Sequence, residues 1–210
     1  MRLKNIKGAK ERISLSPYLI KDTFGFKGNY LKLFKNNNPI HLEIGVGKGD
    51  FLIKMAEQNP NINFIGIEKY DSVLIRAIEK IDEKQLENIY FIREDAILID
   101  KIFDHEIDKL YLNFSDPWPK ERHAKRRLTS PVFLEKYDFI FKGKKVIQMK
   151  TDNRKLFEYS LISANENGYK ISEISLNLYA DDLSGNVATE YETKFVNAGE
   201  NIYRGVFIKD

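Results

Sequence analysis

Apolar runs of strand length alternate with longer segments of helical period through most of the sequence. This alternation is typical of βαβ units around a parallel sheet, because a crossover helix commonly joins two parallel strands. The fold class is therefore α/β. We expect strands at residues 40–44, 64–67, 89–92, 109–114 and 145–149. We expect helices at about 50–58, 72–86 and 153–167, and another that begins at Ser130-Pro131 with serine as its cap.

The end of the chain departs from this order. Two late apolar runs, near residues 170–178 and 202–208, flank the polar stretch 180–200, and we expect this tail to be antiparallel. A length of 210 residues fits a single domain. We expect a basic N-terminal segment at residues 1–35 and the globular domain at residues 36–210.

The composition excludes several kinds of site. The chain has no cysteine, so disulfides, thiolate metal sites, iron–sulfur clusters and cysteine nucleophiles are all excluded, and a reducing cytoplasm suits it. It contains no apolar run near the ~20 residues of a membrane span, and its first residues lack the apolar core of a signal peptide. We therefore expect a cytoplasmic protein that does not bind a membrane. His41, His105 and His123 give no basis for a metal cluster, and we expect no metal.

The strand at 40–44 ends in three alternate glycines, Gly45, Gly47 and Gly49, before a helix. Glycine tolerates positive φ and leaves no Cβ between the backbone and a ligand, so this turn can form a ligand shelf. The spacing G-x-G-x-G differs from the dinucleotide fingerprint and lacks the Lys-Ser/Thr pair of a phosphate loop. Glu43, just before the turn, would repel phosphate and attract an ammonium or sulfonium cation. These features point to S-adenosylmethionine.

Two further acids follow strands of the same sheet. Glu68 ends the second strand, where a carboxylate typically accepts hydrogen bonds from ribose hydroxyls. Asp95 follows the third strand and is placed to accept a hydrogen bond from the adenine amino group, although it could equally cap the helix that follows. Together the glycines and acids predict an adenosyl-ligand site.

The fourth strand runs into Ser115-Asp116-Pro117-Trp118-Pro119, which places a carboxylate and an indole at the carboxyl end of the sheet. Methyltransferases that act on base amines often carry an acid-proline-aromatic motif here, so we expect a planar base as the methyl acceptor. The motif could also be a rigid turn with a packed tryptophan. Whether Trp118 stacks on the base or is structural stays open.

Residues 120–127 contain five cations and one acid, and residues 1–12 contain the same excess. The net charge of +3 therefore hides an acidic remainder. Most charge runs are solvated surface, but one beside a methyl-transfer site is placed to neutralise the phosphates of a nucleic acid. RNA is the favoured partner.

Five segments carry a family resemblance, in this order: EIGVGKG, GIEKYD, YLNFSDPWPKERHAKRR, MKTDNR and TEYETKF. Over residues 40–208 the chain resembles the bacterial tRNA (guanine-N7-)-methyltransferases of the TrmB type. The resemblance implies a class I S-adenosylmethionine-dependent methyltransferase fold with a seven-stranded, mostly parallel, Rossmann-like sheet and an antiparallel C-terminal strand. It implies tRNA as the partner and N7 methylation of a guanosine in the tRNA variable loop, at standard tRNA position 46.

The resemblance also implies roles for individual residues. Asp116 would be catalytic, and the cofactor-binding set would be Glu43, Gly45, Gly47, Gly49, Glu68, Asp95 and Asp116. The substrate-binding set would be Lys120, Asp152, Thr193, Lys194, Phe195 and Val196. The RNA-contacting run would be Arg122, His123, Ala124, Lys125, Arg126 and Arg127. From its charge alone, we expect the basic N-terminal segment to contact tRNA as well.

Some alternatives remain open on the sequence alone. Many relatives carry an acid where this chain has Val196, so the role of that position is undetermined. Asp152 could instead cap the helix that follows it. The fold would also serve a non-catalytic RNA-binding protein or a methyltransferase for another RNA base. The protein could be a monomer or a homodimer.

Overall fold

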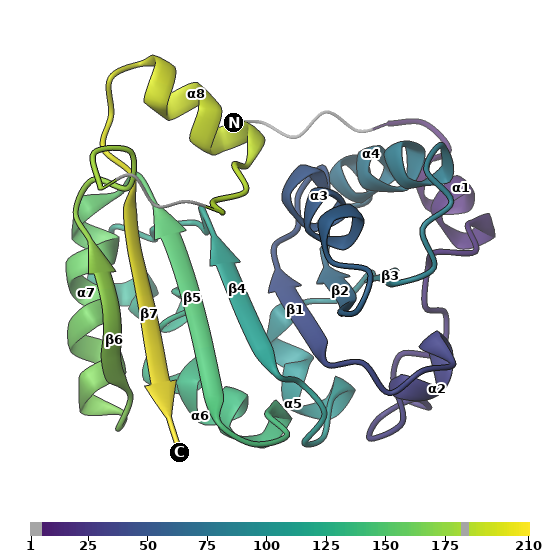
Figure 1. Cartoon of the computed structure of the whole chain (residues 1–210), viewed down its shortest axis with the longest axis horizontal. Coiled ribbons are helices and arrows are strands. Elements are labelled where there is room, and N and C mark those ends of the chain that lie inside the picture. The colour runs from purple at the N-terminus through teal and green to yellow at the C-terminus, as the bar shows by residue number, and fades with distance from the viewer. Residues whose placement is uncertain (1–5, 182–184) are drawn as a thin grey trace.

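The computed structural model describes residues 6–181 and 185–210. Within them, seven strands form a single mixed sheet: β1 (Ile40–Ile44), β2 (Asn63–Ile67), β3 (Ile89–Ile92), β4 (Lys109–Asn113), β5 (Lys145–Thr151), β6 (Lys170–Ser175) and β7 (Tyr203–Lys209). Their spatial order is β3-β2-β1-β4-β5-β7-β6, and β7 runs antiparallel to both of its neighbours (Figure 1). The α/β class, the mostly parallel sheet and the antiparallel tail are confirmed.

The chain begins the sheet at its centre. It builds outward from β1 to β2 and β3, and then crosses back to place β4 on the other side of β1. The strand order therefore reverses between β1 and β4. In open α/β sheets, ligands bind beyond the carboxyl ends of the strands at such a reversal.

Helices cover both faces of the sheet. The helices and 3-10 turns are α1 (Ala9–Leu15), α2 (Leu31–Phe34), α3 (Asp50–Gln58), α4 (Asp71–Asp82), η1 (Ala96–Leu98), α5 (Ile99–Ile102), η2 (Glu121–Arg126), α6 (Pro131–Ile140), α7 (Arg154–Glu166) and α8 (Glu190–Asn197). One hydrophobic cluster joins α1, α3 and α4 to β2 and β3, and a larger one joins α5, α6 and α7 to the central strands. None of the described helices is long and apolar enough to cross a membrane.

Several predicted boundaries shift. The helix predicted at 72–86 ends at Asp82, and Gln85 beyond it has a positive φ of 54°. The fourth strand stops at Asn113 because Phe114 turns to a φ of 50°, before the first proline. The fifth strand continues to Thr151, which pairs with Tyr203 of β7. The strand predicted at 170–178 ends at Ser175.

The helix after Ser130 begins at Pro131 with Ser130 at the N-cap, as predicted, but the serine side chain does not bond to the helix. The Ser130 hydroxyl makes no capping hydrogen bond and donates instead to the carbonyl of Lys125, at 3.2 Å. The serine therefore ties the helix start to the end of the basic run.

The N-terminal segment packs as part of the same domain. Residues 1–5 lie outside the described residues. Helix α1 packs against α4, and the amide of Ile20 donates to the carbonyl of Phe91 at the edge of β3, at 2.9 Å. Tyr30 is fully buried in the core beside Phe103. These contacts attach the described part of the segment to the sheet, while the boundary at residue 35 and RNA contact by this segment stay predictions.

The stretch 180–200 is polar as expected, but its helical part was not predicted. It contains α8, which stands over the carboxyl ends of β4 and β5 (Figure 1). The helix lacks an apolar stripe, and Glu192 is its one buried residue. A capping box between Thr189 and Glu192 defines its start instead.

Candidate cofactor and RNA site

The glycine turn has the geometry that its sequence predicts. Gly45, Gly47 and Gly49 have φ values of 77°, 60° and 83°, which residues other than glycine rarely adopt. A Cβ at Gly49 would lie 2.8 Å from the Cβ of Ala77, so this glycine lets the turn pack on α4. At Gly45 a Cβ would meet nothing within 4 Å. The first glycine therefore faces open space, and the last one is a packing position.

Glu43 is the most unusual group beside this turn. It is 2% exposed, and its Oε1 accepts a hydrogen bond from Asn113 Nδ2 at 2.8 Å. Its Oε2 and the Oδ1 of Asn113 are buried and have no hydrogen-bond donor among the described residues. Burial raises the pKa of Glu43 to about 8. A carboxylate oxygen held in this way is a receptor for a cation, which fits the positively charged end of S-adenosylmethionine.

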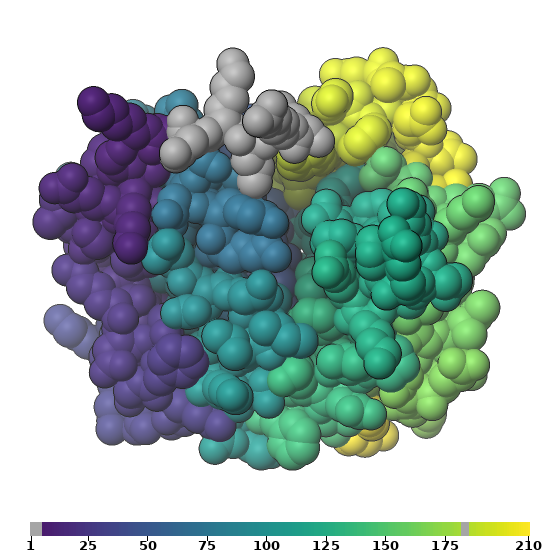
Figure 2. Space-filling model, turned by 180° about the vertical axis from the view of Figure 1, so that it is seen from behind, coloured from purple at the N-terminus to yellow at the C-terminus, as the bar shows by residue number. Residues whose placement is uncertain are grey.

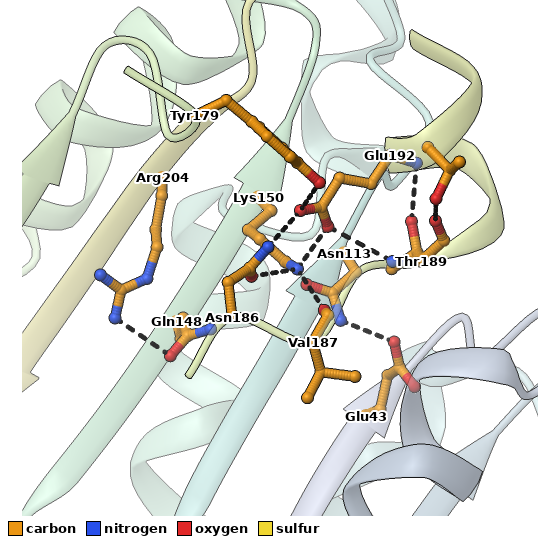
Figure 3. Close-up of polar contacts among 11 residues, drawn as sticks. Glu43, Asn113, Gln148, Lys150, Tyr179, Asn186, Val187, Thr189, Glu192 and Arg204 are labelled. Carbon is orange, nitrogen blue, oxygen red and sulfur yellow. Dashed lines mark hydrogen bonds and ion pairs between the residues drawn. The ribbon is translucent and has the colours of Figure 1, made fainter. Parts of the chain in front are cut away.

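A pocket opens beside Glu43 and the glycine turn. Its inner wall includes Phe51 and Asn113, and its outer wall is Thr189, Glu190 and Tyr191 at the start of α8. The close-up in Figure 3 shows Glu43 and Asn113 close to the residues that hold α8. Segments from both ends of the sequence thus enclose one site.

Glu68 holds the second strand against the glycine turn. It is buried and accepts hydrogen bonds from the amides of Gly47, at 3.3 Å, and Tyr70, at 3.0 Å. Burial raises its pKa, and these amides oppose the rise. Glu68 does not line the pocket beside Glu43, so the ribose contact stays a prediction for the neighbouring surface.

Asp95 adopts the capping role that was its alternative. Its Oδ1 accepts a hydrogen bond from the amide of Ile97 at 3.1 Å, and its Oδ2 pairs with Lys69 at 3.4 Å. The carboxylate is half exposed. Capping leaves it accessible, so the adenine contact stays a prediction.

Asp116 lies just beyond the end of β4. Its side chain is exposed, and none of the described residues donates a hydrogen bond to its carboxylate. Trp118 follows it with a φ of 41°. The indole lies 4.8 Å from the guanidinium of Arg126 and meets His123 edge-on at 5.8 Å. A carboxylate open to a ligand therefore lies next to an indole packed between two side chains of the basic run.

The basic run divides into an exposed set and one buried residue. Lys120, Arg122, Lys125 and Arg126 are exposed on and beside η2. Arg127 is 6% exposed, donates to the carbonyl of Trp118 at 3.2 and 3.3 Å, and lies 4.3 Å from the ring of Tyr159. The guanidinium of Arg127 thus makes its hydrogen bonds within the protein, where it stabilises the turn at Trp118. We therefore restrict the predicted phosphate contacts of the run to its exposed cations.

Helix α8 brings the predicted substrate residues to the same edge. Phe195 stacks on Phe114 with an interplanar angle of 12°. Thr193 and Lys194 line an open hollow of about 670 Å³ next to Lys48 and two cations of α4, Arg76 and Lys80. In Figure 2, which is seen from behind, a hollow separates the blue part of the chain from the green part, below the yellow α8.

Val196 is partly buried in α8, and Asp152 is half-buried just beyond β5. Burial raises the pKa of Asp152. The helix that follows is capped by Asn153, whose Oδ1 accepts from the amide of Leu156 at 2.9 Å. Asp152 therefore does not cap this helix, and its substrate contact stays a prediction.

Sequence reasoning missed three residues that shape the site. Asn113 holds Glu43, and Lys150 forms a buried ion pair with Glu192 at 2.5 Å. Lys150 directly after the predicted strand 145–149 was a signal, because a lysine that continues a buried strand needs a partner. The spacing Thr189-x-x-Glu192 was another, because it is a capping box.

The chain matches a family model described as "Putative methyltransferase" over residues 37–205. It is 49% identical over 212 residues to the tRNA (guanine-N(7)-)-methyltransferase of Lachnoclostridium phytofermentans, covering 100% of this chain and 99% of the relative. It is 50% identical over 206 residues to the enzyme of that name from Oceanobacillus iheyensis, covering 97% of each. The chain belongs to the bacterial tRNA (guanine-N7-)-methyltransferase family. The resemblance read from the five sequence segments is thereby confirmed.

Solved structures of other methyltransferases share the fold at much lower identity. An antibiotic-related methyltransferase superposes with a TM-score of 0.68 at 15% identity, over 87% of this chain and 93% of that one. A SAM-dependent methyltransferase from Aquifex aeolicus gives a TM-score of 0.54 at 13% identity, over 97% and 99%. At such identities the likeness supports the methyltransferase fold and no particular substrate.

Proposed function

We propose that this protein transfers a methyl group from S-adenosylmethionine to N7 of a guanosine in the variable loop of tRNA. The observation that best supports S-adenosylmethionine as the cofactor is the buried Oε2 of Glu43. This oxygen has no hydrogen-bond donor among the described residues and lies beside a glycine turn. The names of the relatives support tRNA and guanine N7. When bound, S-adenosylmethionine supplies an electrophilic methyl group on a sulfonium.

Glu43, Gly45, Gly47 and Glu68 would hold this cofactor, with Asp95 at its adenine end. Glu43 would neutralise a positive charge, because its unpartnered oxygen is already desolvated and gains most from a cation. Gly45 would let the ligand approach the backbone, because nothing occupies the space where its Cβ would be.

Asp116 would act on the acceptor base. Guanine N7 carries an in-plane lone pair, so it needs no base to remove a proton before it attacks. Positive charge spreads over the purine as the new bond forms, and a carboxylate at the guanine edge is strengthened by that charge. Asp116 would accept a hydrogen bond from guanine N1–H or the 2-amino group and so orient N7. Its exposed carboxylate, free of donors from the described chain, suits this role.

The exposed cations would bind the tRNA backbone. Lys120, Arg122, Lys125 and Arg126 lie next to Asp116 in sequence, and Lys194 faces the hollow on the other side. Contacts of this kind supply affinity without sequence specificity, and they offset the few kcal/mol that unstacking a base costs. Lys194 and Arg126 would thus bind RNA phosphates on either side of the acceptor guanosine.

The test is methylation of an unmodified tRNA by the purified protein with methyl-labelled S-adenosylmethionine, followed by mass spectrometry of the nucleosides. We expect N7-methylguanosine as the labelled product. Label in another nucleoside would contradict the proposed base, and absence of label with intact RNA binding would indicate a non-catalytic protein.

A further inference from the structure

The buried pair of Lys150 and Glu192 has no part in the chemistry proposed above. Lys150 Nζ donates to Glu192 Oε2 at 2.5 Å, to the carbonyl of Val187 at 2.9 Å and to Asn186 Oδ1 at 3.1 Å. Both charged side chains are 0% exposed. An ammonium group has three hydrogens, and all three have acceptors here. Lys150 thus binds two residues of the segment that leads into α8 and one residue of α8 itself.

Glu192 accepts several further hydrogen bonds. Its Oε1 accepts from the hydroxyl of Tyr179 at 3.0 Å and from Asn186 Nδ2 at 2.5 Å, and its Oε2 also accepts from the amide of Thr189 at 3.3 Å. Figure 3 shows these contacts converging on the carboxylate of Glu192, which also pairs with Lys150 of β5. We call residues 186–197 the strap, because they cross the carboxyl end of the sheet.

The strap forms part of the ligand site. Thr189, Glu190 and Tyr191 line the pocket beside Glu43. Further along, Phe195 stacks on Phe114, whose amide donates to the carbonyl of Lys150 at 2.8 Å. A displacement of the strap would therefore move the pocket wall and the predicted tRNA-contacting residues together.

Among the described residues, the apolar contacts of the strap are few: Val187 packs with Phe51 and Tyr111, and Phe195 stacks on Phe114. Within α8, Glu192 is the one buried residue, and eight residues are too few for a stable isolated helix. The other ion pair of the helix, Lys48 with Glu190, is 44% and 52% exposed, and exposed pairs contribute little. Lys150 and Glu192 therefore supply the buried polar contacts that orient the strap, next to these few apolar ones.

We propose that Lys150 and Glu192 are positioning residues that fix the strap over the sheet, and so set both the outer wall of the cofactor pocket and the placement of residues 193–196 toward tRNA. The identity of these ligands rests on the proposed function. A buried ion pair is a poor source of stability, because desolvation offsets its attraction, but its directional hydrogen bonds select one arrangement. Two apolar side chains would fill the space without specifying the position of α8.

Four variants separate positioning from stability. Lys150→Met and Glu192→Gln each leave one buried charge unpaired, whereas Lys150→Met/Glu192→Met removes both. Asp138→Asn is the matched control, because Asp138 pairs with Lys209 at 2.6 Å and accepts from Tyr169, away from the pocket. Three quantities are measured: the melting temperature, hydrogen exchange of residues 186–197 without cofactor, and the Kd for S-adenosylmethionine by calorimetry.

We expect both single variants to exchange faster in the strap while β1 and β4 stay protected, and to bind the cofactor roughly tenfold more weakly or worse. The double variant should regain melting temperature relative to the single variants and still bind weakly, with a fast-exchanging strap. Asp138→Asn should lower the melting temperature and leave cofactor affinity unchanged. Unchanged strap exchange, or cofactor affinity that recovers with stability in the double variant, would overturn the proposal. A wild-type protein that binds no S-adenosylmethionine would instead overturn the proposed function, since the exchange arm needs no ligand.

Discussion

The two sides of the site are built differently. On the cofactor side, Glu43 and Glu68 are buried and held by Asn113 and by backbone amides. On the acceptor side, Asp116 and the cations of the basic run are exposed, with Arg127 as the buried exception. A small ligand of fixed shape is served by groups fixed in advance, because preorganisation lowers the cost of binding. A large polyanion instead needs accessible charges that contact its surface.

The largest effect should come from the acceptor side. Asp116→Ala should lower the rate of tRNA methylation by roughly a hundredfold or more, because a group that stabilises developing charge is lost. The tRNA affinity should stay nearly intact, because one carboxylate adds little to binding of a polyanion. Methylation kinetics and a filter-binding assay measure the two quantities.

Asp116→Asn serves as the control for that experiment, because it keeps the shape of the side chain and removes its charge. It should lose most of the rate as well. Turnover retained in the alanine variant would remove Asp116 from the mechanism.

On the cofactor side, Glu68→Ala should weaken S-adenosylmethionine binding by about tenfold to a hundredfold, since hydrogen bonds to a charged group are worth ~1.5 to 3 kcal/mol. Calorimetry gives the affinity directly. Glu106→Gln is the matched control, because Glu106 also accepts from backbone amides, those of Gly28 and Tyr30, but precedes β4 at the end of the sheet opposite the glycine turn.

The control should lose stability and keep its cofactor affinity. If the two variants changed cofactor affinity equally, the loss in Glu68→Ala would reflect general destabilisation and not a ligand contact.

Glu43 links the cofactor side to pH. Its pKa is about 8 in the folded protein, above its ordinary value of 4.5, so the folded state favours the protonated acid. Stability from this group is complete below pH 4.5 and is lost as the pH rises toward 8. Glu43→Gln should remove that loss, which thermal unfolding across this pH window measures.

Cofactor affinity should change in the opposite direction over the same window. A cation prefers the ionised carboxylate, so the affinity of the wild-type protein should rise by up to about fiftyfold from pH 6 to 8, the ratio of the ionised fractions for a pKa of about 8, while that of Glu43→Gln stays flat. If cofactor affinity had the same pH dependence in the two proteins, Glu43 would not bind the positive charge of the cofactor.

The smallest effect distinguishes two neighbouring arginines. Arg126→Ala should reduce the salt dependence of tRNA binding by about 0.7 to 0.9 in log–log slope, for one lost phosphate contact. Arg127→Met should lower the melting temperature, because its hydrogen bonds to the carbonyl of Trp118 are lost, and should leave the slope unchanged. A reduced slope in Arg127→Met alone would reverse the assignment.

The cofactor side was largely predictable from the sequence, because its determinants are local. The strand at 40–44, the glycine turn and the helix at 50–58 follow from apolar runs and positive-φ residues, and all three were confirmed. The pairing of Glu43 with Asn113 was not predictable, because it joins residues 70 positions apart across the β1–β4 reversal.

The outer wall could not be predicted from apolar periodicity. Helix α8 is held by the ion pair between Lys150 and Glu192 and by a capping box, and neither produces a hydrophobic pattern. Arg127 shows the same limit. Its sequence context is that of an exposed basic run, but its side chain is buried in the protein. The ion pair joins residues 42 positions apart, whereas Arg127 is buried because its own turn folds back and places the Trp118 carbonyl, nine positions away, against it.

The central claim is that this fold methylates N7 of one guanosine in the tRNA variable loop. The most direct test compares two transcripts of the same unmodified tRNA, one with and one without that guanosine, incubated with the protein and labelled S-adenosylmethionine. Mass spectrometry should find N7-methylguanosine in the first transcript and none in the second. Equal labelling of both transcripts, or label in any other nucleoside, would contradict the claim.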